Sequence, residues 1–144
     1  MKKQTIIVII FLAVIAFFSG NHFFSRKNYN SAEVGGHKFK LELAVAKDEK
    51  KRGLGNRESL CGDCGMLFVF PEKGIYPFWM KNMNFDLDII WIGDGKIVYI
   101  AKNVAHNSLV TIKPERAADR VLEINSGLSD KYGLVEGEKV FFSY

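Results

Sequence analysis

The sequence lacks several features that would assign a protein to a class at once. Its 144 residues contain no internal repeat, no low-complexity segment and no G-x-S-x-G nucleophile elbow. There are two cysteines, and beyond residue 25 the histidines are His37 and His106, a set that does not favour a four-ligand structural zinc site. We therefore predict no metal and no cofactor. Apolar and charged fractions of 48% and 25% are those of a globular protein and exclude a disordered or fibrous chain.

Acidic residues are absent from the first 27 positions, and this absence accounts for the net charge of +4. The segment contains Lys2, Lys3, Arg26 and Lys27, which leaves 20 − 4 = 16 basic residues against 16 acidic ones in the remainder. A nucleic-acid-binding domain normally has a clustered basic face, and the sequence shows none. We predict no nucleic-acid partner.

The N-terminal segment "MKKQTIIVIIFLAVIAFFSG" has a basic start and an apolar run over residues 6–18, which is a membrane-targeting pattern. The match to a cleavage site, Val14-Ile15-Ala16, lies inside this run, so we favour a retained anchor over a cleaved signal peptide. Either alternative places the globular part outside the cytoplasm, at the cell membrane if the anchor is retained and secreted if it is cleaved. We predict a signal peptide or transmembrane anchor over residues 1–25, a tether over 26–32 and a single globular domain over 33–144.

Short strands dominate the globular domain. Gly93-Asp94-Gly95 separates "LDIIWI" from "KIVYIAKNV" and is the strongest hairpin signal in the chain. A turn at Gly35-Gly36 separates two more strands, and the stretches "GMLFVFP", "RVLEIN" and "EKVFFSY" predict three others. We predict an α+β, mainly β fold, in which a compact antiparallel or mixed sheet curls into a small barrel or sandwich, preceded by an N-terminal transmembrane helix.

Two short helices are predicted from their start and stop signals. The first covers about residues 49–54, with Asp48 as its N-cap. The second is capped by Asn125 or Ser126 and ends near Gly133.

Five stretches of the domain resemble the motifs of a known family. "KKRGLGNRESL" contains an R-G-L-x-x-R-x-x-L pattern, "GMLFVFP" resembles the next block, and "FWMKNMNFDLDIIWI" is similar to the central F-W-M-K-N signature. "NVAHNS" and "VLEINSGLSDKYGLVEGEKV" resemble the last blocks. The chain thus resembles the prokaryotic domain of unknown function 192 over about residues 39–140. This resemblance implies a compact β-rich fold in an exported or anchored domain, and it implies no reaction. The chain departs from the usual pattern at Asp86, a position often held by proline.

The stretch "PFWMKNMNFDLDIIWIG" sets polar residues between a tryptophan and a strand predicted to be buried on both faces. A lysine is almost never fully buried without a partner, and Asp88, at the entrance of this strand, is the candidate counter-ion of Lys81. We predict that Lys81, Asn82 and Asp88 form a polar cluster walled by Trp79. The cluster either fixes the fold or binds the carboxylate, phosphate or hydroxyls of a polar ligand. Arg57 would join it through its planar guanidinium, and the alternative is a surface ion pair with Glu58 or Asp48.

The alternating oxygens of Asn82, Asn84, Asp86 and Asp88 would lie on one face of an extended strand and suggest calcium. The loop version of such a site requires glycine and glutamate where the chain has Leu87 and Gly93. We therefore prefer a polar turn.

The motif Cys61-Gly-Asp-Cys64 is predicted to form a disulfide that pins a loop. A thiol oxidoreductase would place this motif at the start of a helix, whereas here a strand follows. His106-Asn107-Ser108 is interpreted as a polar loop.

These observations lead to three functional hypotheses. The first is a non-catalytic binding domain at the outer face of the membrane, whose ligand is an envelope polymer, a peptide or a small polar molecule. The second is a hydrolase or transferase of envelope material that uses Asp88, His106 or Lys81. The third is a structural accessory protein whose polar cluster only specifies the fold.

Overall fold

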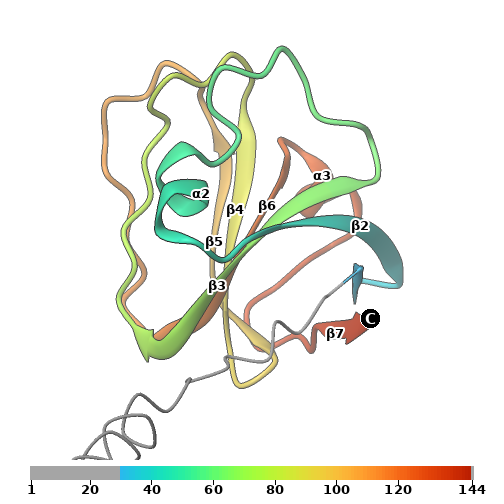
Figure 1. Ribbon diagram of the computed structural model, residues 1–144. Coiled ribbons are helices and arrows are strands. Elements are labelled where there is room, and N and C mark those ends of the chain that lie inside the picture. Colours follow the sequence, from blue (N-terminus) through green and yellow to red (C-terminus); the bar gives the residue numbers. More distant parts are fainter. Residues whose placement is uncertain (1–29, 144) are drawn as a thin grey trace, which may run out of the picture.

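The computed structural model describes residues 30–143, and this part of the chain forms one mixed sheet with two short helices (Figure 1). The seven strands follow the order β5-β4-β6-β3-β2-β1-β7. Neighbouring strands are antiparallel except β2 and β3, which are parallel. The predicted mainly β fold with two short helices is confirmed. The elements are β1 (Ser31–Val34), β2 (His37–Ala44), α2 (Lys47–Arg52), β3 (Cys64–Gly74), β4 (Leu87–Gly93), β5 (Lys96–Val104), β6 (Ala118–Asn125), α3 (Leu128–Lys131) and β7 (Phe141–Ser143).

The sheet curls into a half-barrel, and the last part of the chain joins its two edges (Figure 1). At one edge β7 pairs with β1. Just before β7, the Val140 N–H donates to the Gly95 carbonyl and the Ile97 N–H donates to the Glu138 carbonyl, each at 2.9 Å. These bonds attach the segment to the start of β5, the strand at the other edge. The predicted curled sheet is therefore confirmed, and its shape is a half-barrel.

The predicted hairpin between β4 and β5 is confirmed. Gly93 pairs with Lys96, so Asp94 and Gly95 form a two-residue turn. Both have positive φ, 54° and 68°, which is the conformation of a type I′ turn. Aspartate and glycine tolerate this conformation better than other residues, which explains the strength of the sequence signal.

β4 is buried on both faces, as predicted, and it divides the interior into two cores. Ile89 and Trp91 belong to one hydrophobic cluster together with Leu54, which lies two positions after α2; we call it the α2-side core. Ile90 belongs to the other cluster, against which Leu128 of α3 packs; we call it the α3-side core. Because side chains alternate along a strand, odd and even positions of β4 face different cores.

Helix α2 lies in the crossover connection that the parallel pair β2 and β3 requires. The prediction that Asp48 is the N-cap is wrong, because the helix begins at Lys47 after Ala46. A carboxylate oxygen of Glu49 reaches back and accepts the backbone N–H groups of Val45 at 2.9 Å and Ala46 at 2.7 Å. No residue of α2 is buried, so its basic side chains remain at the surface.

The domain begins slightly earlier than predicted. Ser31 and Ala32, which were expected in the tether, are buried and pair with Lys40 and Phe39 of β2. The predicted transmembrane anchor and the tether up to residue 29 lie outside the described residues. Neither helix of residues 30–143 has the length and apolar character needed to cross a bilayer.

Candidate functional site

The segment between β3 and β4, residues 75–86, lies across the α2-side core and carries the candidate site. It is irregular and is fixed at two points. Phe78 and Ile112 exchange two backbone hydrogen bonds of 2.8 Å, and the Trp91 indole N–H donates to the Tyr76 carbonyl at 2.8 Å. Phe78 also meets Trp91 edge to face, with ring centroids 5.6 Å apart. These contacts direct Phe78 inward and fix the orientation of the residues that follow.

Trp79 and Lys81 project from this segment at the surface. Met80 between them is buried in the α2-side core, whereas Trp79 is 57% exposed and Lys81 is exposed. The Lys81 ammonium lies 5.7 Å from the centroid of the Trp79 ring, within the range of a cation–π contact. The anchoring of Phe78 and Met80 therefore explains why an indole and an amine stand side by side in solvent.

Asn82 fixes the turn that follows Lys81. It has a positive φ of 58°, and its carbonyl oxygen accepts the backbone N–H of Asn56 at 2.8 Å. The Asn84 side-chain amide donates to the Arg57 carbonyl at 2.8 Å. The loop after α2 and the loop before β4 are thus held together, so that α2 faces Trp79 and Lys81.

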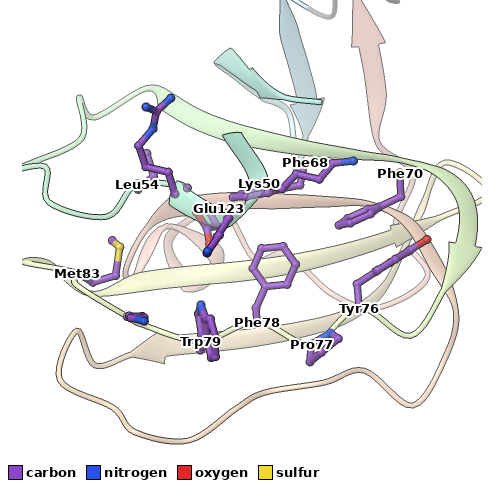
Figure 2. A pocket seen from close by; sticks show the side chains of 14 residues that line it. Lys50, Leu54, Phe68, Phe70, Tyr76, Pro77, Phe78, Trp79, Met83 and Glu123 are labelled. Atoms are coloured by element: carbon purple, nitrogen blue, oxygen red, sulfur yellow. The ribbon is translucent and has the colours of Figure 1, made fainter. Parts of the chain in front are cut away.

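A pocket of about 280 Å³ lies between α2 and residues 76–83 (Figure 2). Aromatic and aliphatic side chains form its walls, a buried glutamate from β6 is part of its lining, and four basic residues from α2 and the loop before β4 contribute to it. The lining residues are Lys50, Lys51, Arg52, Gly53, Leu54, Phe68, Phe70, Tyr76, Pro77, Phe78, Trp79, Lys81, Met83 and Glu123.

The four basic residues of the pocket form no ion pair within the described part of the chain, although Glu49 lies near Lys50 and Glu42 near Arg52. Lys51, Arg52 and Lys81 are exposed, and Lys50 lies 4.5 Å from the centroid of the Phe70 ring. Partial burial lowers the pKa of Lys50, and this effect is opposed by Glu49. Within residues 30–143 none of the four forms an ion pair, although seven other ion pairs occur there. The pocket therefore presents a concentrated positive charge to solvent.

Glu123 is a candidate site residue that sequence reasoning missed. It lies in β6 opposite Met66 of β3 and Ile89 of β4, is 5% exposed, and faces the α2-side core. Its Oε2 has no hydrogen-bond partner among the described residues. Burial raises the pKa of Glu123 to about 8, and the charge of Arg57 only partly opposes this effect. The carboxyl group is therefore mainly protonated at neutral pH.

Arg57 does not line the pocket. Its guanidinium donates two hydrogen bonds to the carboxylate of Glu42 in β2, with N···O distances of 2.8 and 2.5 Å. This pairing lowers the pKa of Glu42 and raises that of Arg57. Arg57 therefore forms an ion pair, as the alternative predicted, but its partner is Glu42 and neither Glu58 nor Asp48.

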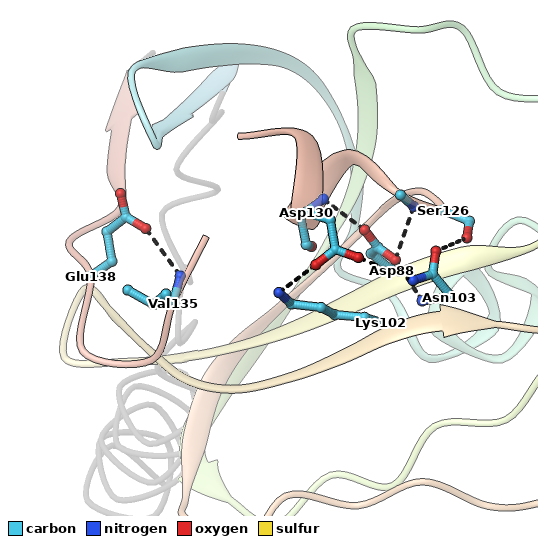
Figure 3. Close-up of polar contacts among 9 residues, drawn as sticks. Asp88, Lys102, Asn103, Ser126, Asp130, Val135 and Glu138 are labelled. Carbon is cyan, nitrogen blue, oxygen red and sulfur yellow. Dashed lines mark hydrogen bonds and ion pairs between the residues drawn. The ribbon is translucent and has the colours of Figure 1, made fainter. Parts of the chain in front are cut away.

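Asp88 lies on the other side of β4, toward the α3-side core, and is fully buried (Figure 3). Its carboxylate accepts backbone N–H groups from Asn103 at 2.7 Å, Gly127 at 3.3 Å and Ser129 at 2.7 Å. It therefore caps the start of α3, a role that was expected of Asn125 or Ser126. The structure does not bring Asp88 to Lys81 as a counter-ion. No cluster of metal-binding side chains occurs within residues 30–143.

Asp86 and His106 form a pair beside the pocket. One carboxylate oxygen of Asp86 contacts the His106 backbone N–H at 2.7 Å and the ring Nδ1 at 2.8 Å. These hydrogen bonds lower the pKa of Asp86. A second, more open hollow lies there, and Trp79 and Lys81 line both this hollow and the pocket. The other residues of the hollow are Met80, Asn82, His106, Asn107, Ser108 and Leu109.

Cys61 and Cys64 form the predicted disulfide, with their Cα atoms 5.1 Å apart. The Asn125 side-chain amide donates to the carbonyl oxygens of Leu60 at 3.1 Å and Cys61 at 3.0 Å. Strand β3 starts at Cys64. The disulfide therefore closes the loop before β3, and the Asn125 hydrogen bonds attach this loop to the end of β6.

A family model for DUF192, described as "Uncharacterized ACR", matches residues 30–142. The chain belongs to this family. The match covers β1 to β6, both helices and most of β7, so the entire half-barrel is the DUF192 domain. This confirms the resemblance seen in the motifs.

Two solved structures resemble the DUF192 domain of this chain. One is a protein of unknown function from Novosphingobium aromaticivorans, with 34% identity and a TM-score of 0.74, covering 77% of this chain and 83% of that one. The other is a putative transcription regulator from Sinorhizobium meliloti, also with 34% identity, with a TM-score of 0.71 and coverage of 74% and 83%. No curated protein matches the chain.

Proposed function

We propose that this DUF192 protein is a membrane-anchored, extracytoplasmic binding domain that holds a small anionic molecule in the pocket beside Trp79, without catalysis. The observation that carries the proposal is the combination of apolar walls with four basic residues that form no ion pair within residues 30–143. A volume of about 280 Å³ suits a small molecule or the end group of a peptide or envelope polymer. The membrane location rests on the apolar run at residues 6–18.

The arrangement suggests how such a ligand would lie. Ligand pockets are usually apolar, with a few polar groups that fix orientation. Phe70, Phe78 and Trp79 would contact the apolar or planar part of the ligand. Lys81 and the basic residues of α2 would bind its carboxylate, sulfonate or phosphate, because anions form charge-assisted hydrogen bonds with such groups. An exposed Trp79 above a pocket favours this role over a purely structural one.

A transcriptional role, as named for the Sinorhizobium protein, gains little support in this chain. The residues after position 27 have equal numbers of acidic and basic side chains, whereas DNA-binding domains carry a large excess of positive charge on one face. The basic residues here gather around a small pocket with apolar walls, which suits a small ligand better than a duplex.

The test is a ligand titration of the full-length protein in detergent, monitored by tryptophan fluorescence with benzoate, phenyl phosphate and naphthalene sulfonate as probes. We expect at least one probe to change the emission of Trp79, and Lys81→Met to weaken its binding by about 10- to 150-fold, the value of one charge-assisted hydrogen bond. Trp79→Phe should remove the response, since Trp91 is fully buried. Lys131→Met, in α3, is the matched control. Absence of binding by every probe, or equal affinities for the two lysine variants, would contradict the proposal.

A second candidate function, a hydrolase or transferase of envelope material, is favoured by one observation. Glu123 is a pocket carboxyl whose pKa is raised to about 8 by burial, as is common for a general acid. Incubation with envelope fragments would distinguish the two functions. Product formation that is lost in Glu123→Gln supports the enzyme, whereas saturable binding without turnover supports the binding domain.

A further inference from the structure

We infer that Glu123 is a hydrogen-bond donor that selects the ligand, so that the pocket takes an anion whose opposite, inner end carries an uncharged acceptor such as a carbonyl oxygen. This inference rests on the proposed function for the anionic end of the ligand. It adds a second requirement at the inner end, which the basic residues do not impose.

The first step is the position of the carboxyl group. Glu123 lines the pocket from a central strand of the sheet and is 5% exposed (Figure 2). Lys51, Arg52 and Lys81 line the same pocket from exposed positions. The pocket thus has a carboxyl group at its inner end and positive charges at its outer end. A ligand that fills the pocket must therefore carry one group that binds the carboxyl group and another that binds the positive charges.

The second step is the missing partner of Glu123. A buried polar atom without a hydrogen bond is costly, and the great majority of such atoms in native proteins are paired. Oε2 of Glu123 has no partner within residues 30–143. The other buried carboxyl group there, that of Asp88, accepts three backbone N–H groups. Because Glu123 lines the pocket, its carboxyl group can form a hydrogen bond with a ligand bound there.

The third step is the space beside the carboxyl group, which Gly53 provides at the end of α2. A Cβ atom at this position would lie 3.3 Å from the Phe68 ring and 3.9 Å from Oε2 of Glu123. Gly53 also has a φ of 51°, which L side chains rarely adopt. Backbone shape and the absence of a side chain therefore keep the inner end of the pocket open.

The fourth step is the protonation state. The neighbours of Glu123 on β3 and β4 are apolar, Met66 and Ile89, and the first effect on its pKa is desolvation, which raises it to about 8. A protonated carboxyl donates to an acceptor and has no charge to pair with an ammonium group. The titratable and charged groups that face it are Arg57 from the loop before β3, Lys50, Lys51 and Arg52 from α2, and Tyr76 and Lys81 from the segment after β3.

The inference predicts a pH dependence. Affinity for an acceptor-bearing anion should fall as the pH rises through about 8, because Glu123 then loses the proton that it donates. The Glu123→Gln variant keeps an N–H donor that does not titrate in this range. It should bind such a ligand over the whole range, without the inflection.

The experiment compares three para-substituted benzoates by calorimetric titration of the full-length protein in detergent. Para-acetylbenzoate offers a carbonyl acceptor, para-isopropylbenzoate has the same shape without it, and para-aminomethylbenzoate offers an ammonium group. We expect the acetyl compound to bind about 10-fold more tightly than the isopropyl compound, as for one additional hydrogen bond. Glu123→Leu should abolish this difference and still bind the isopropyl compound, which also shows that the variant is folded. Glu123→Gln should retain the preference.

The outcomes separate the two proposals. If none of the benzoates binds, or if they bind the wild type and Lys81→Met equally, the proposed function fails and the inference fails with it. If the benzoates bind through Lys81 but the acetyl and isopropyl compounds bind equally, the inference is overturned and the proposed function stands. A preference for the aminomethyl compound, or an acetyl preference that persists in Glu123→Leu, overturns the inference as well.

Discussion

At the scale of single residues, the domain contrasts two buried carboxyl groups. Asp88 accepts three backbone N–H groups and belongs to the framework. Glu123 has an unpaired oxygen and a pKa raised to about 8 by burial. A buried polar group without partners costs about 1–3 kcal/mol, and such costs are often found at functional sites. We therefore expect Glu123 to lower the free energy of unfolding of the domain.

This expectation gives a testable prediction about pH. The pKa of Glu123 is about 8 in the folded state, above its ordinary value of 4.5, so between these values the folded protein binds the extra proton. Stability contributed by this group must then decrease as the pH rises through that window and stay constant above it. We expect the thermal midpoint of the wild type to fall between pH values of about 5 and about 8.5 more steeply than that of Glu123→Gln.

Two comparisons complete the test. Glu123→Leu should melt higher than the wild type at about pH 8.5, because it removes a buried charge. The exposed residue Glu58 provides the control, and Glu58→Gln should reproduce the wild-type slope. Parallel slopes for the wild type and Glu123→Gln would show that the carboxyl group does not titrate in this window.

Part of the candidate site could be predicted at the residue scale. Trp79, Lys81 and Asn82 lie within four consecutive positions, so one anchored segment places all three together. Arg57 and Asp88 have partners that are distant in sequence, and no local pattern identifies them. A signal for Glu123 existed, because alternation in "RVLEIN" puts it on the same face as Val121. A single acid in a strand does not reveal whether that face is covered.

At the scale of elements, local signals predicted strands better than helix starts. The buried strand β4 and its hairpin follow from β-branched residues and an Asp-Gly turn, both of which act locally. The start of α2 was misplaced because Glu49 caps it from within the helix. The start of α3 is capped by Asp88 from another strand, and only tertiary structure brings this group there.

The cap of α3 gives the second prediction of the Discussion. Asp88→Asn removes the charge and turns an N–H₂ donor toward backbone N–H groups, which leaves buried donors unpaired. We expect a loss of about 2–4 kcal/mol in the free energy of unfolding, with faster hydrogen exchange of the Ser129 amide. Asp130→Asn, an exposed change in the same helix, should have a much smaller effect. Unchanged exchange at Ser129 would show that Asp88 is not the cap.

At the scale of the whole molecule, the two ends of the described chain lie together. The Asn30 N–H donates to the Ser143 carbonyl at 2.8 Å, next to the pairing of β1 with β7. None of these residues lines the pocket. An anchor that precedes residue 30 would therefore join the domain at an edge of the sheet separate from the proposed binding site. A membrane attachment and an open pocket are compatible in this arrangement.

The last prediction concerns that attachment. In a bacterial host, the full-length protein should sediment with membranes after a high-salt wash, and a variant that lacks residues 1–25 should not. Protease added outside spheroplasts should digest the domain, because the proposal places it beyond the cytoplasmic membrane. Labelling of Cys61 and Cys64 should require prior reduction, since disulfides persist in oxidising compartments. Protease resistance in spheroplasts combined with equal thiol labelling before and after reduction would place the domain in the cytoplasm. Recovery of a shortened, soluble form would instead show that the N-terminal segment is a cleaved signal peptide.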